Sequence, residues 1–163
     1  DDGEIETFLN EYLKSIKNIG LQLNMGVSLN QAGLYNQNAN FDKALSAMEM
    51  AVKRGETVVH YHKLGIYKVL YALDDKTVLR GYYQDVIGKL EKYDRDNGTG
   101  LTGMLKTYLE NNGSLQAVSE KRFVHRNTVT NQLKKIESIT GLNPLDLEDK
   151  VKFCMGFYIK DML

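Results

Sequence analysis

The chain has 163 residues and a mass of 18.5 kDa, enough for one domain or two small ones with an apolar core. Its 42% apolar and 26% charged residues exclude disorder over most of the chain, and its single cysteine, Cys154, excludes an intrachain disulfide and suits a reducing, cytoplasmic location. Lysine and arginine number 21, as do aspartate and glutamate, which excludes a uniformly basic surface for nucleic acid.

The first part of the chain is predicted to be α+β, with few strands and several helices. Apolar residues recur at helical spacing in two segments, and the second segment ends in cations followed by Gly55. Two other segments alternate apolar and polar residues or are rich in β-branched and aromatic residues, as strands are. The predicted order is helix 5–19, strand 21–27, loop 30–40, helix 41–52 and strand 57–61.

The rest of the chain is predicted to be all-helical, so that the protein is mainly α. Asp75, Ser114 and Asp146 are suitable N-caps. The segment Asp94–Gly100 has the composition of a linker, and we therefore divide the chain into an α+β part with connecting helices, 1–96, and a helical domain, 97–163. The predicted helices cover residues 64–73, 78–93, 101–110, 115–122, 126–139 and 147–162.

The helices 115–122 and 126–139 are separated by a short break at Phe123 and Val124, which is the length pattern of a helix-turn-helix. In this motif the second helix enters the DNA major groove. Along that helix, Val129, Leu133 and Ile136 have the spacing of a core-facing stripe. The residues left to face DNA are Arg126, Asn127, Thr130, Asn131 and Lys134.

The side chains on this face have the chemistry that base reading needs, because arginine pairs with guanine and asparagine with adenine. Thr128 and Lys135 are better placed for phosphate oxygens, and His125 stands where a cap or a phosphate contact is expected. Residues 119–135 carry five cations and one carboxylate, a net charge of +4, whereas residues 136–149 carry four carboxylates and no cation. These features together favour DNA binding over a merely solvated helix face.

The string Phe-Val-His-Arg-Asn-Thr-Val at 123–129, followed by Thr-Gly-Leu at 140–142 and Glu148-Asp149, resembles the C-terminal helix-turn-helix of the PucR/CdaR family of bacterial transcription regulators. Weaker similarity upstream resembles the degenerate cyclase-like domain that precedes it in that family. The resemblance implies the DNA-binding output part of a regulator, with the recognition helix over 126–139. It also implies operator DNA as the partner, a homodimer or higher oligomer, and a small-molecule effector sensed by a region absent from this chain.

One departure from the family pattern concerns the turn. Where the family tends to have a buried leucine just before the turn, this chain has Arg122. A buried, unpaired arginine is costly, so we expect Arg122 to extend outward toward the DNA backbone and Phe123 to fill the core.

Signals for an enzyme are weak. His60 and His62 lie on one face of a predicted strand, but a catalytic zinc needs three protein ligands and no third histidine or cysteine is near in sequence. Cys154 lies in an apolar helix, and no glycine-rich phosphate loop follows a strand. We therefore expect no catalysis, no metal and no cofactor. The alternative to DNA binding is a non-catalytic protein-protein interaction or oligomerisation module, which the salt dependence of binding would distinguish.

Overall fold

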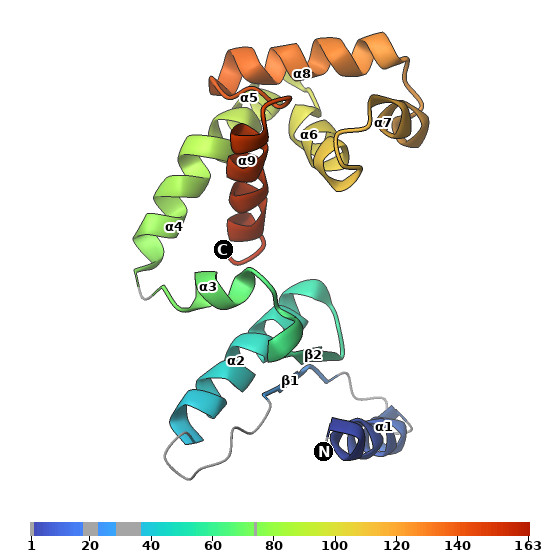
Figure 1. Ribbon diagram of the computed structural model, residues 1–163, viewed down its shortest axis with the longest axis vertical. Coiled ribbons are helices and arrows are strands. Elements are labelled where there is room, and N and C mark those ends of the chain that lie inside the picture. The colour runs from blue at the N-terminus through green and yellow to red at the C-terminus, as the bar shows by residue number, and fades with distance from the viewer. Residues whose placement is uncertain (1, 18–22, 29–36, 74) are drawn as a thin grey trace. The chain divides into compact units, whose positions relative to one another are not determined.

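The computed structural model describes residues 2–17, 23–28, 37–73 and 75–163 (Figure 1). The chain is mainly helical, as predicted, and divides into two compact units, Asp1–Leu73 and Asp74–Leu163. Within the described ranges, no helix combines the length and the apolarity that crossing a bilayer requires.

The first unit contains a two-stranded parallel sheet packed on a helix. Met25, Gly26 and Val27 pair with Val58, Val59 and His60. A Cβ atom on Gly26 would lie 1.9 Å from the carbonyl oxygen of Ala44, so the close approach of helix and strand requires glycine here. The elements are α1 (Asp2–Lys17), β1 (Met25–Val27), α2 (Gln37–Arg54), β2 (Val58–His60), η2 (Tyr61–Lys63) and α3 (Tyr67–Tyr71).

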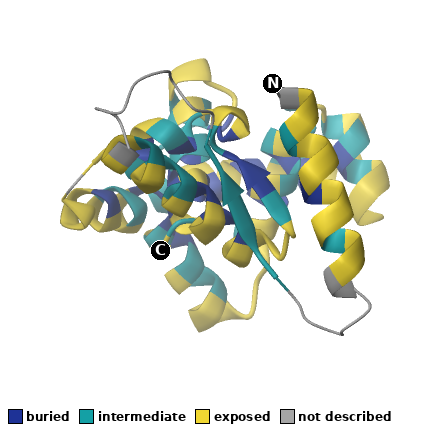
Figure 2. Ribbon diagram, turned by 90° about the horizontal axis from the view of Figure 1, so that it is seen from below, coloured by how far each residue is buried: buried dark blue, intermediate teal, exposed yellow. Residues whose placement is uncertain are grey.

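These elements confirm both predicted strands in part and both predicted helices. Helix α2 starts at Gln37, inside the predicted loop 30–40, and the remainder of that loop up to residue 36 lies outside the described residues, as do residues 18–22. Figure 2 shows α1, which starts beside the N-terminus, as mostly exposed. Its Glu6 Oε1 lies 3.1 Å from Nε2 of His60 on β2, a contact that joins the two elements.

The second unit is all-helical, and its helices surround a continuous apolar core. The core includes Leu90, Met104, Leu105, Val118, Val129, Ile136 and Phe153, all fully buried. Its elements are α4 (Lys76–Tyr83), a π-helical segment η3 (Gln84–Gly88), α5 (Lys89–Asn97), α6 (Leu101–Glu110), α7 (Leu115–Arg122), α8 (Arg126–Thr140) and α9 (Leu147–Lys160).

The three predicted N-caps are present. Asp75 accepts a hydrogen bond from the backbone N–H of Thr77 at 2.8 Å, Ser114 from Ala117 at 3.2 Å, and Asp146 from Asp149 at 3.1 Å. Each cap satisfies a donor that the first turn of a helix leaves unpaired.

The predicted linker 94–100 is structured. Helix α5 continues to Asn97 and ends at Gly98, whose φ of +63° is left-handed. The Asp94 carboxylate accepts from the backbone N–H groups of Leu101 and Thr102, both at 2.8 Å, and so caps α6. The two compact units divide at residue 73, whereas the division at 96 that composition suggested stays a prediction about where the helix-turn-helix domain begins.

Candidate nucleic-acid interface

The turn between α7 and α8 is built by two backbone hydrogen bonds. The N–H of Phe123 donates to the carbonyl of Glu120 at 3.3 Å, and that of Val124 to Ser119 at 3.0 Å. This is the Schellman pattern of helix ends, which puts one residue in the left-handed region. That residue is Phe123, with a φ of +54°.

The expectation that Phe123 fills the core was wrong. Its side chain is 94% exposed, because the left-handed backbone turns it outward, and Val124 packs against the core instead. Arg122 is exposed, as expected, but its guanidinium lies against α6: Nη1 donates to Thr107 Oγ1 at 3.3 Å. A Cβ atom on Gly103 would lie 3.6 Å from the same nitrogen, so the guanidinium lies beside a position of α6 that has no side chain.

Helix α8 is anchored by one apolar face. Val129, Leu133 and Ile136 are at most 3% exposed and pack in the core of the second unit. At the start of the helix, His125 has an extended backbone, and its Nδ1 accepts a hydrogen bond from the backbone N–H of Asn127 at 3.2 Å. The anchor fixes the rotation of α8 about its axis, and the imidazole caps its first turn.

The opposite side of α8 presents polar side chains to solvent. Asn127, Asn131 and Lys134 are exposed and are spaced by four and three residues, so they share one face. Arg126 is also exposed, at the first turn. Among the described residues, neither Arg126 nor Lys134 has an ion-pair partner, so both charges are available to a ligand.

The other candidate residues lie away from the centre of this face. Thr130 is half-buried, and its hydroxyl donates to the carbonyl of Arg126 at 3.2 Å. Lys135 is exposed, but its Nζ lies 5.1 Å from the ring centroid of Tyr93 on α5, a cation-π contact. Thr128, seven residues before Lys135, is exposed on the same side of the helix.

The acidic block 136–149 has a structural use that composition did not indicate. Lys152 pairs with Glu148 at 3.1 Å and with Asp149 at 2.8 Å, and Asp149 also accepts from the backbone N–H of Asn143 at 2.8 Å. These hydrogen bonds, the one from Lys152 first, lower the pKa of Asp149. Three of the four carboxylates of the block, those of Asp146, Glu148 and Asp149, therefore have partners at the start of α9.

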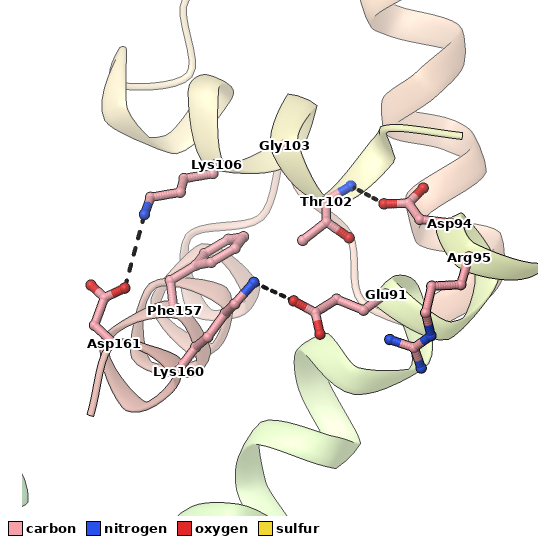
Figure 3. A pocket seen from close by; sticks show the side chains of 9 residues that line it. All are labelled: Glu91, Asp94, Arg95, Thr102, Gly103, Lys106, Phe157, Lys160 and Asp161. Carbon is pink, nitrogen blue, oxygen red and sulfur yellow. Dashed lines mark hydrogen bonds and ion pairs between the residues drawn. The ribbon is translucent and has the colours of Figure 1, made fainter. Parts of the chain in front are cut away.

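A charged cleft of about 470 Å³ lies between α5, α6 and α9 (Figure 3). Within it, Glu91 pairs with Lys160, and Lys106 with Asp161 at 4.0 Å. Glu91 also accepts a hydrogen bond from the hydroxyl of Tyr83, and burial together with this bond raises the pKa of Tyr83 to about 12. The paired charges connect three helices, which gives the cleft a structural role that the sequence did not suggest.

Comparison with known proteins finds a family model that matches the C-terminal part of the chain. Residues 101–159 match the PucR C-terminal helix-turn-helix domain. The DNA-binding transcriptional activator AdeR of Bacillus subtilis is 27% identical over 143 residues, covering 83% of this chain and 34% of AdeR. The proline-responsive transcriptional activator PutR of the same organism is 26% identical over 117 residues, covering 72% of this chain and 28% of PutR. The chain thus spans about a third of the length of these relatives.

The similar solved structures include the crystal structure of a regulator of polyketide synthase expression from Bifidobacterium adolescentis. It matches 74% of this chain and 49% of its own, with 22% sequence identity and a TM-score of 0.49.

Proposed function

We propose that the chain is the DNA-binding output part of a bacterial transcription regulator, because residues 101–159 match the PucR C-terminal helix-turn-helix domain. The observation that carries the proposal is the polar face of α8. Asn127 and Asn131, together with Arg126 and Lys134, which have no ion-pair partner in the described part of the chain, lie opposite a stripe of core residues. The helix therefore exposes these side chains without loss of packing. Such a helix can enter the major groove.

Each candidate residue has a proposed role in this interface. Arg126 pairs with the two acceptors of guanine, and Asn127 and Asn131 pair with adenine. Lys134 binds backbone phosphate, as do Thr128 and Lys135 along the flank of the helix. Thr130, at the margin of the face, contacts DNA through its partly exposed side chain, and Arg122 approaches the backbone from the end of α7.

The regulator is further proposed to act in the cytoplasm as a homodimer or higher oligomer. Two-fold related recognition helices read half-sites about 34 Å apart, so one copy of α8 contacts only half of an operator. Because the chain spans about a third of AdeR and PutR, we place the sensing of a small-molecule effector in a part of the protein outside these residues.

A DNA titration at several salt concentrations tests the proposal. The probe is the promoter region beside the gene, with a scrambled duplex of the same length as the control. Binding through phosphates predicts that log K falls linearly with log salt, by about 0.9 per phosphate contacted. Equal affinity for both duplexes, or no binding at low salt, would contradict the proposed function and favour an interaction module.

A further inference from the structure

His125 has a ring nitrogen that the helix does not use. Its Nδ1 accepts the N–H of Asn127 at 3.2 Å, so Nδ1 carries no proton in the neutral ring. A neutral imidazole has one N–H, which must then be on Nε2. The capping hydrogen bond therefore fixes the tautomer of this histidine.

The remaining N–H, on Nε2, has no hydrogen-bond partner among the described residues. His125 is exposed. Its neighbours in sequence are Arg126 and Asn127, the first residues of the face proposed to bind DNA. Two other helices of this unit are capped by the carboxylates of Asp75 and Asp146, which accept the capping hydrogen bond and have no donor to offer a ligand.

We infer that His125 performs two tasks with its two nitrogens: Nδ1 caps α8, and Nε2–H donates to a DNA phosphate. This inference rests on the proposed function and adds a phosphate contact made by a neutral donor. Because the donor is uncharged, it releases no counterion from DNA, unlike Lys134. The contact fixes the position of α8 on the duplex and does not read sequence.

The tautomer can be measured without DNA. Two-bond ¹H–¹⁵N correlation spectra at about pH 8, where an ordinary imidazole is neutral, distinguish the two tautomers. The chain has three histidines, and the signals of His125 are those that vanish in His125→Asn. We expect the Nε2–H tautomer. An Nδ1–H tautomer, or an average of both, would overturn the inference.

The phosphate contact is tested with His125→Asn, whose side-chain oxygen retains the cap but does not extend as far. We expect unchanged helix content and melting, about a three- to tenfold loss of affinity for promoter and scrambled duplex alike, and the wild-type salt slope. Asp75→Asn, the same kind of cap exchange on α4, should leave affinity unchanged.

The outcomes separate the two proposals. If wild-type protein binds the promoter duplex and His125→Asn binds it within twofold of wild type, the phosphate contact is refuted and the proposed function stands. If the wild-type protein binds no DNA, the proposed function fails, and the phosphate contact with it. If His125→Asn does not fold, His125→Ser, which also places a capping oxygen at this position, takes its place in both measurements.

Discussion

Arg122, the last residue of α7, donates from Nη1 to Thr107 Oγ1 on α6 at 3.3 Å. The bond replaces the apolar contact expected of a buried leucine at this position. Both partners lie near solvent, so the bond holds two surface groups and leaves the core to Val118 and Val124. This hydrogen bond connects α6 with α7, the first helix of the helix-turn-helix, at the surface.

The hydrogen bond between Arg122 and Thr107 is predicted to contribute little to stability. Arg122→Ala should lower the free energy of unfolding by less than about 1 kcal/mol, because exposed hydrogen bonds and ion pairs contribute little. Urea denaturation followed by circular dichroism measures the change, with the exposed neighbour Lys121→Ala as the matched control. A loss above about 2 kcal/mol would mean that Arg122 is part of the core.

A second prediction concerns Glu91 in the charged cleft. Burial acts to raise the pKa of Glu91, but the hydrogen bonds from Lys160 and Tyr83 outweigh it and lower the pKa below its usual 4.5. A carboxyl whose pKa is lowered by folding stabilises the fold above its unfolded pKa, and this stabilisation is lost as pH falls through the folded value.

The variant Glu91→Gln should therefore be less stable than wild type at neutral pH, and the difference should shrink as pH falls below about 4.5. Unfolding free energies from urea titrations at several pH values provide the measurement, with the exposed Asp85→Asn as control. A difference between Glu91→Gln and wild type that stays constant with pH would contradict the role assigned to the carboxylate.

A third prediction tests whether Lys134 on α8 binds backbone phosphate or reads a base. Lys134→Ala should weaken binding to promoter and scrambled duplexes by the same factor and should lower the salt slope by about one. Its ammonium has no ion-pair partner among the described residues, so the substitution removes a phosphate contact without breaking one inside the protein. Loss confined to the promoter duplex would instead make Lys134 a base-reading residue.

The sequence located most helices to within a few residues because their boundaries are encoded locally. Ser114 and Asp146 are caps that any helix would use, and the spacing of Val129, Leu133 and Ile136 defines the buried side of α8. The face that follows from this spacing is the part of the candidate site that could be predicted from the residues alone.

Predictions from the sequence were wrong where a residue bonds to a different element or where the backbone of a turn sets the direction of a side chain. Hydrophobicity predicts that Phe123 is buried, but the left-handed backbone of the turn directs it to solvent. Asp94 begins a segment with the composition of a linker, yet its carboxylate caps α6. The π-helical segment Gln84–Gly88 interrupts a helix that was predicted to be regular. It could not be predicted, because the spacing of apolar residues does not show which backbone hydrogen bonds form.

Binding of Asn127→Ala to the promoter duplex and to its scrambled control tests the central claim most directly. The capping bond uses the backbone N–H of Asn127, so the substitution removes only the exposed amide. We predict that affinity for the promoter duplex falls by about 1–3 kcal/mol while affinity for the scrambled duplex is unchanged, with Ser138→Ala, on the same helix, behaving as wild type. Promoter affinity equal to that of wild type would contradict the assignment of this face of α8 to the major groove.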